Sequence, residues 1–413
     1  MRSLVIAASL ALGAAAAFGA SLAQADNLKI GYIDPLSGGG ASVGEVGLKH
    51  FQFLADEINA KGGVNGQQIE IVPFDGKTNP QESLIQAQKA IDQGIRFITQ
   101  GNGSSVAGAL LDFVAKYNDR NPGKEVLYFN YAAVDPVLTN DKCSFWHFRW
   151  DANSDIKMAA LTNFLKQRPA VKKIYLINQD YSFGQSVRTQ ARAMLKEKRP
   201  DIEIVGDELH PLLKITDFSP YIAKIKASGA DTVITGNWGQ DIALLLKAAA
   251  DAGLQTDFYT YYAGGAGGPT AIKQTGLSDR VFDIVEGNAN DAPASAQKTE
   301  QEFRDKYGVT LWYPRAVNEM RMFAKAANEA KSNDPKAVAA KLEDMKVEGF
   351  DGGEIVMRKD DHQLFQDMFV RSFGPLKPGQ KFDEEKTGWG WTTQGRVAGK
   401  DTLLPTTCKM ERP

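Results

Sequence analysis

Hydrophobic residues follow two alternating periods along most of this chain. Short runs rich in β-branched residues predict buried strands, and apolar residues spaced three and four apart predict helices between them. In the first half the predicted strands are 28–33, 68–74, 95–99 and 126–131. Because short links join these strands to the helices, the alternation predicts a parallel, doubly wound sheet. Ligands bind such sheets at the carboxyl ends of the strands.

The same rhythm restarts after Arg149. The second half contains predicted strands at 173–178, 202–208, 232–236, 258–262 and 281–285, with helices at 183–198, 221–228 and 241–252 between them. From residue 297 onward the pattern is mostly helical, and a strand-like run occupies 368–373. The chain is therefore expected to form two α/β lobes of similar construction.

The segment that follows the predicted strand at 95–99 has the composition of an anion-binding loop. Gly101 and Gly103 allow a tight turn, and Ser104 or Ser105 can cap a helix whose first amides have no intrahelical partner. Free amides, two hydroxyls and the positive end of a helix dipole would hold a small carboxylate without a cationic side chain. A well-capped turn without a ligand is the alternative interpretation of these residues.

The loops after other predicted strands carry aromatic and amide side chains. Together with their neighbours they comprise Asn130, Tyr131, Ala132, Ala133, Val134, Tyr181, Trp238 and Tyr262. Any one of them could simply be the edge of a core. As a group they predict a concave site for a small, partly apolar ligand, because aromatic walls with a few polar groups are typical of such sites.

The amino terminus has the pattern of an export signal. An apolar, alanine-rich run follows Arg2 and ends at Ala23, Gln24 and Ala25, which is a small-x-small cleavage pattern. Residues 1–25 are therefore predicted to be removed after Ala25, which places the mature protein in the periplasm. No later run is long and apolar enough to predict a transmembrane helix.

Composition and motifs narrow the classes of function. A formal net charge of -2 argues against nucleic acid or an anionic membrane as the main partner. Cys143 and Cys408 are the two cysteines, and an isolated pair in an exported protein is expected to form a disulfide. The histidines have no metal-ligand spacing, and no nucleophile elbow, Walker motif or dinucleotide fingerprint is present. We therefore expect neither an enzyme nor a bound cofactor or metal.

Several longer stretches, taken together, resemble the solute-binding proteins of branched-chain amino acid ABC transporters. They are KIGYIDPLSGGGASVGEVG (29–47), GNGSS (101–105), FNYAAVDPVLT (129–139) and NQDYSFGQS (178–186), after an export signal. The resemblance implies a monomer with two doubly wound parallel-sheet lobes of type I periplasmic-binding-protein topology. Such proteins close on a ligand and deliver it to the permease subunits of an ABC transporter in the inner membrane.

The same resemblance implies three crossovers between the lobes. The restart of the α/β rhythm puts them near 148–151, 286–290 and 349–353. Lobe 1 would then consist of 26–148 plus 289–350. Lobe 2 would consist of 149–288 plus 351–413.

Relatives that bind leucine-like amino acids hold the ligand carboxylate with the loops that match Ser104-Ser105 and Ala132 to Val134, and place an aromatic residue at the position of Tyr181. This chain has Val134 where a hydroxyl residue is common. It has 263–265, Ala-Gly-Gly, where those relatives place a glutamate for the ammonium group. A buried ammonium without an acceptor costs several kcal/mol.

The departure at 263–265 predicts a carboxylate ligand with an aromatic or other apolar body and no α-ammonium group. Two alternatives remain open. Another acid, such as Asp180 or Asp241, could replace the missing glutamate, so that the ligand is a branched-chain or other amino acid. The second alternative is that the protein is an exported ligand sensor on the same fold.

Overall fold

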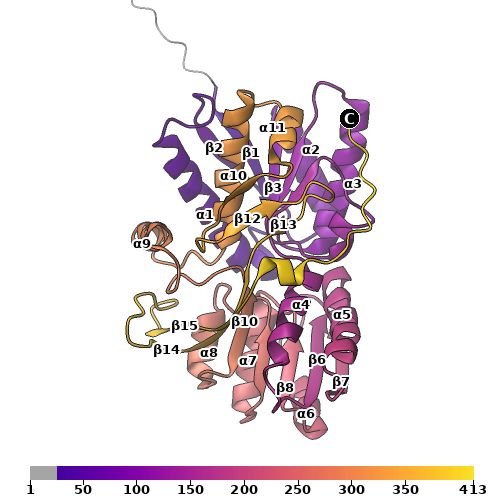
Figure 1. Cartoon of the computed structure of the whole chain (residues 1–413), viewed down its shortest axis with the longest axis vertical. Coiled ribbons are helices and arrows are strands. Elements are labelled where there is room, and N and C mark those ends of the chain that lie inside the picture. Colours follow the sequence, from indigo (N-terminus) through magenta and orange to yellow (C-terminus); the bar gives the residue numbers. More distant parts are fainter. Residues whose placement is uncertain (1–25) are drawn as a thin grey trace, which may run out of the picture.

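The computed structural model describes residues 26–413. The predicted export signal and its cleavage site at Ala25 lie outside the described residues. None of the helices in 26–413 has the length and apolar character needed to cross a membrane. In Figure 1 the indigo and purple lobe 1 lies above the magenta and pink lobe 2.

Lobe 1 is built on a five-stranded parallel sheet with the order β2-β1-β3-β4-β5. Its strands are β1 (Leu28–Asp34), β2 (Ile69–Asp75), β3 (Phe97–Gln100), β4 (Leu127–Asn130) and β5 (His147–Arg149). Its helices are α1 (Ala41–Asn59), α2 (Pro80–Asp92), α3 (Ser104–Arg120), α9 (Ala294–Tyr307), α10 (Pro314–Ala330) and α11 (Pro335–Leu342). Local chemistry sets the helix starts: the side chain of Asn79 accepts a hydrogen bond from the Glu82 amide, and Pro80 occupies the first helical position of α2.

Lobe 2 contains a seven-stranded sheet with the order β15-β14-β10-β9-β8-β6-β7. Five strands are parallel: β6 (Lys173–Gln179), β7 (Glu203–His210), β8 (Thr232–Thr235), β9 (Asp257–Thr260) and β10 (Val281–Val285). The hairpin of β14 (Met368–Pro375) and β15 (Trp389–Val397) is antiparallel and extends the sheet from β10. The helices are α4 (Ser154–Leu165), α5 (Ser182–Lys198), α6 (Ser219–Ser228), α7 (Gln240–Asp251) and α8 (Gly268–Thr275).

The predicted fold class, two α/β lobes with parallel-sheet cores, is confirmed. The sequence pattern did not predict strand β15 or the antiparallel hairpin that it forms. Short 3-10 helices are η1 (Gly38–Gly40), η2 (Pro136–Thr139) and η3 (Gly399–Thr402).

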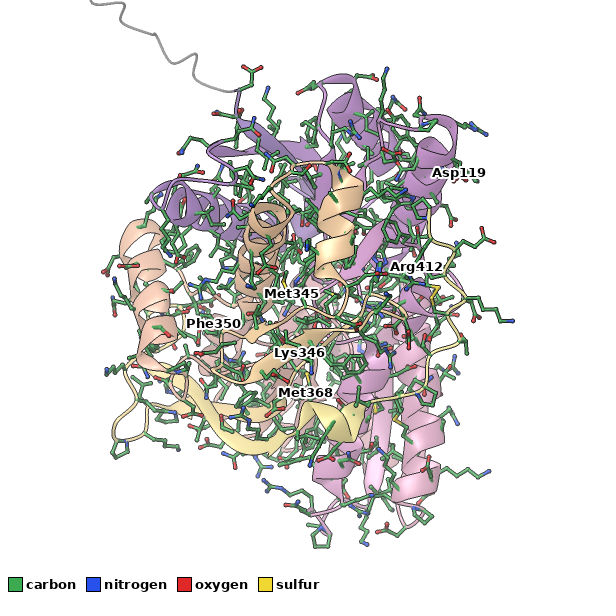
Figure 2. All side chains as sticks on the ribbon, turned by 45° about the horizontal axis from the view of Figure 1, so that its top comes forward. Asp119, Met345, Lys346, Phe350, Met368 and Arg412 are labelled. Carbon is green, nitrogen blue, oxygen red and sulfur yellow. A yellow bond between two sulfur atoms is a disulfide. The ribbon has the colours of Figure 1, made fainter. Side chains whose placement is uncertain are left out.

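Before residue 398 the chain passes between the two lobes three times. The chain crosses after β5 and again after β10. The third passage differs from the prediction, because a small sheet of β11 (Lys346–Glu348), β12 (Glu354–Met357) and β13 (Leu364–Phe365) intervenes. Ile355, Met357 and Leu364 are buried in the core of lobe 1, so we assign 351–364 to lobe 1 and the passage to the residues just before Met368. Figure 2 labels Met345, Lys346 and Phe350, which precede this passage in the chain, and Met368, which follows it.

The end of the chain, residues 398–413, returns from lobe 2 to lobe 1 and is called the C-terminal strap below. It begins with η3 against α4 of lobe 2. Cys408 then forms a disulfide with Cys143, which follows β4 of lobe 1. Beyond it, Arg412 Nε donates to Glu343 Oε1 at 2.8 Å, and Figure 2 shows Arg412 beside lobe 1. The strap therefore provides a fourth connection between the lobes.

Candidate ligand-binding site

A cavity lies between the two lobes, where the carboxyl ends of the parallel strands face each other. Its volume, open solvent at the mouth included, is about 570 Å³. The lining residues from lobe 1 are Val43, Gly101, Asn102, Gly103, Ser104, Ala132, Val134, Trp312, Tyr313 and Arg315. Those from lobe 2 are Tyr181, Phe183, Trp238, Gly239, Tyr261, Tyr262, Gly264, Gly265, Asp283, Val285 and Arg371. Both lobes thus supply walls, as a site that closes on its ligand requires.

The loop between β3 and α3 is held in place by Asp34, the last residue of β1. The Asp34 carboxylate accepts hydrogen bonds from the amides of Gly101 (3.2 Å) and Asn102 (2.9 Å) and from the hydroxyl of Tyr131 (2.5 Å). Burial raises the pKa of Asp34 to about 6, although these hydrogen bonds favour the ionised form. Gly101 has no room for a side chain, since a Cβ there would lie 2.8 Å from the Tyr131 ring and the Ala132 methyl. Asp34 and Tyr131 therefore fix the position of the loop between β3 and α3.

Helix α3 begins differently from the prediction. Gly103, with a φ of 102°, is its N-cap, and no side chain caps it. The expectation that Ser104 or Ser105 caps this helix is therefore wrong. Ser104 is buried, and its Oγ accepts a hydrogen bond from the Asp135 amide at 3.2 Å, which leaves its own hydrogen free to donate. Ser105 is exposed and does not line the cavity.

The start of α3 is nevertheless suited to an anion. The first amides of a helix have no intrahelical acceptor, and here they lie at the positive end of the helix dipole beside the Ser104 hydroxyl. The amides of Gly101 and Asn102, in contrast, are already bonded to Asp34. The anion-binding groups are therefore those of the helix start itself rather than those of the glycine turn.

The loop after β4 contributes side chains to the cavity, but its backbone amides are already hydrogen-bonded. The amides of Ala132 and Ala133 both donate to Asn130 Oδ1, at 3.3 and 2.8 Å. Ala132 and Val134 line the cavity, whereas Asn130, Tyr131 and Ala133 are buried beneath it or beside it. This loop therefore presents methyl groups to the cavity.

Aromatic residues from lobe 2 form the opposite wall. The Trp238 indole donates from Nε1 to the Tyr181 hydroxyl at 2.8 Å, so the two rings are fixed as a unit. The Tyr262 hydroxyl donates to Asp151 at 3.0 Å and lies 3.5 Å from the carbonyl oxygen of Ala132 in lobe 1. Tyr262 thus spans the gap between the lobes. These three predicted residues are brought together around the cavity.

Buried charges lie where the hinge meets the cavity, and their signs balance. Arg315, at the start of α10, contacts Glu286 Oε1 at 2.7 Å and Asp151 Oδ2 at 3.3 Å. Lys157, on α4, contacts Asp151 Oδ1 at 2.9 Å. Burial opposes ionisation of Glu286, but Arg315 and Lys157 outweigh it and lower the pKa of Glu286 to about 2. In this hinge network two carboxylates, Asp151 and Glu286, face two cationic side chains, Arg315 and Lys157.

A second buried pair lies beside Gly264, in the 263–265 segment that the resemblance matches to the ammonium-binding glutamate of relatives. Asp283 Oδ2 accepts from Arg371 Nη2 and from the Gly264 amide, both at 3.2 Å. A Cβ at Gly264 would lie 2.7 Å from that carboxylate oxygen and 2.9 Å from Arg371 Nη2. Glycine at 264 thus makes room for the pair. Neither acid proposed from the sequence fills this role, because Asp180 is exposed and Asp241 does not line the cavity.

Sequence reasoning missed the charged and several aromatic lining residues: Asp283, Arg315, Arg371, Trp312 and Tyr313. Asp283 and Arg371 interrupt apolar strands, VFDIV and MFVRSFG. A charge inside a buried strand is a signal that could have marked both residues. Within 26–413, no group of three or more His, Cys, Asp or Glu residues is arranged to hold a metal ion.

The fold and the interlobe cavity define a solute-binding protein, and comparison with known families agrees. The family model described as "Periplasmic binding protein" matches residues 27–374, and the chain belongs to this family. It is a periplasmic solute-binding protein.

Individual relatives cover nearly the whole chain. "Leu/Ile/Val-binding protein homolog 4" of Brucella abortus is 34% identical over an alignment 422 positions long that covers 98% of each chain. The crystal structure of the leucine-, isoleucine-, valine-, threonine- and alanine-binding protein from Brucella ovis, in a closed conformation, has a TM-score of 0.83 and 32% identity and covers 94% of this chain and 100% of that one. A solute-binding protein of an ABC transporter from R. palustris, in complex with benzoate, has a TM-score of 0.78 over 93% of this chain and 99% of that one. Its identity is 17%, so this likeness concerns the fold alone.

Proposed function

We propose that this protein captures a small carboxylate with an aromatic or other apolar body between its lobes and delivers it to the permease of an ABC transporter. The observation that carries the proposal is the pairing of the charges around the cavity. The acids Asp283, Glu286 and Asp151 each contact a cation. An ammonium group would therefore have to compete with Arg371, Arg315 or Lys157, and would lose most of its own hydration on entry.

The carboxylate of the ligand is assigned to the start of α3 and the Ser104 hydroxyl, since a helix start with unpaired amides favours an anion. Its body is assigned to the Tyr181–Trp238 unit and to Tyr262. Stacking on such rings adds about 0.5–1.5 kcal/mol beyond the burial of area. The protein would act as a monomer that closes on one ligand without changing it covalently.

A matched pair of ligands tests this proposal. Calorimetry with 3-phenylpropionate and phenylalanine compares two molecules that differ in the ammonium group. We expect the deaminated acid to bind at micromolar concentration and phenylalanine to bind at least 100-fold more weakly, because several kcal/mol are lost when an ammonium is buried without a free acceptor. Binding of phenylalanine or leucine, with no binding of the deaminated acids, would reverse the assignment.

Neighbouring serines provide a matched pair of variants. Ser104→Ala removes a hydrogen bond to a charged group and should weaken the acid by about tenfold to 100-fold. Ser105→Ala alters an exposed residue of the same helix turn and should leave the affinity unchanged. Equal effects of the two substitutions would move the carboxylate away from the assigned position.

Amino acid binding is the second candidate, and the names of the relatives favour it. Homologues at 32–34% identity are described as binding leucine, isoleucine and valine, one of them threonine and alanine as well. In that case Asp283 would have to serve the ammonium group in place of Arg371. The same calorimetric pair decides between the two candidates.

A further inference from the structure

The Asp283–Arg371 pair has an unused hydrogen-bond donor. Arg371 is 8% exposed. Its Nη1 donates to the Gly287 carbonyl and its Nη2 to Asp283, both at 3.2 Å. Its Nε is shielded from solvent and has no acceptor within residues 26–413. Burying a donor without a partner is unfavourable, so buried donors in native proteins are normally satisfied by protein, water or ligand.

Both members of the pair face space that a ligand can reach. Asp283 and Arg371 line the interlobe cavity from lobe 2, on the opposite lobe from Ser104. A second cavity of about 380 Å³ adjoins this end and shares Gly264, Val285, Trp312 and Arg371 with the first. The Arg371 guanidinium also stacks on Trp391, 4.6 Å from the ring centroid, which fixes its plane. The Asp283–Arg371 pair is therefore a rigid polar group at the boundary between the two cavities.

The chemistry of the pair selects among ligand groups. A second carboxylate would meet Arg371 but be repelled by Asp283, and an ammonium would meet Asp283 but be repelled by Arg371. A carbonyl or ether oxygen would satisfy the donor alone. A hydroxyl accepts one hydrogen bond and donates another, so it can engage both members.

We infer that Asp283 and Arg371 form a second polar subsite, which binds a hydroxyl group carried on the aromatic body of the ligand, away from its carboxylate. The hydroxyl oxygen accepts from Arg371, and its hydrogen is donated to Asp283. This inference rests on the proposed function, because it presupposes an acid held at Ser104. It narrows the ligand class to hydroxylated aromatic carboxylates.

Two pairs of acids of different length test the inference in the unaltered protein by calorimetry. They are benzoate with 4-hydroxybenzoate, and 3-phenylpropionate with 3-(4-hydroxyphenyl)propionate. In at least one pair the hydroxylated acid should bind about tenfold to 100-fold more tightly, which corresponds to a hydrogen bond with a charged group. Because this comparison changes only the ligand, it remains decisive even where a variant fails to fold.

Variants show which residues cause the tighter binding of the hydroxylated acid. In Arg371→Met the advantage of the hydroxylated acid over its parent acid should fall to less than threefold. Asp283→Asn should retain part of the advantage, since an amide oxygen can still accept. Arg280→Met is the control: Arg280 pairs with Asp257 at 3.1 Å at the amino ends of β9 and β10, whereas the cavity lies at the carboxyl ends of these strands.

The outcomes separate the inference from the proposal beneath it. If the parent acids bind and hydroxylation gives no advantage in either pair, the hydroxyl subsite is refuted and the proposed function stands. If neither parent nor hydroxylated acids bind while amino acids do, both are refuted. An advantage that survives unchanged in Arg371→Met also overturns the assignment to this pair.

Discussion

Removing Arg315 should destabilise the protein strongly, because Arg315 neutralises two buried carboxylates of the hinge network. Its side chain is 2% exposed, and those of Glu286 and Asp151 are fully buried. In Arg315→Met only Lys157 remains to face both acids, 2.9 Å from Asp151 but 3.9 Å from Glu286. Breaking a buried pair by removing one partner costs about 3–5 kcal/mol, and we expect a loss of that size.

Denaturant unfolding of the ligand-free protein measures this loss. The matched control is Arg321→Met on the same helix: Arg321 also contacts a glutamate, Glu57 at 3.3 Å, but its side chain is 41% exposed. Exposed pairs contribute about 0–1 kcal/mol. A loss in Arg315→Met no larger than in the control would refute the reasoning.

A double variant isolates the charge effect from the loss of packing. Arg315→Met combined with Glu286→Gln leaves a neutral Asp151–Lys157 pair at 2.9 Å. It should therefore be more stable than Arg315→Met alone by at least about 1 kcal/mol, a coupling typical of residues in one ion network. If the double variant is less stable than the single one, packing rather than charge dominates at this position.

Three further results are expected. Burial raises the pKa of Glu319 from 4.5 to about 8, so the stability of the wild-type protein should fall by about 1.4 kcal/mol per pH unit as the pH rises between those values. In urea unfolding Glu319→Gln should lack this decline, whereas the exposed control Glu302→Gln should retain it. Trp238→Ala should weaken an aromatic acid more than tenfold by calorimetry and a ring-free acid much less, since a stacking surface is lost. Cys408→Ser should lower stability by up to about 5 kcal/mol, because the disulfide closes a long loop; two free thiols in peptide maps of the exported, non-reduced protein would contradict this.

Elements whose signals are local could be predicted from the sequence. The Asn79–Pro80 start of α2 depends on neighbouring residues only. The lobes followed from the alternation of strand and helix patterns, and the aromatic residues of the cavity from their positions after strands. Tyr181 and Trp238 could be placed at the same edge without knowledge of any contact between them.

Features that depend on distant pairing could not be predicted. Asp283 meets Arg371 only because β14 adds antiparallel to β10, and nothing local indicates that pairing. The α/β rhythm placed the third passage between the lobes at 349–353, whereas the apolar residues that follow this segment are buried in lobe 1. The role of Ser104 depended on Asp34, which lies in a different strand and orders the loop before α3.

The disulfide of the C-terminal strap has a consequence for the covalent topology of the molecule. Cys143 precedes all of lobe 2, and Cys408 follows all of it, at a sequence separation of 265. Lobe 2 is therefore enclosed in a covalent ring whose closure lies in lobe 1. A single protease cut anywhere between these cysteines leaves one covalently connected molecule rather than two pieces. The two ends of lobe 2 also stay together when it unfolds, so that it refolds as a ring instead of as an open chain.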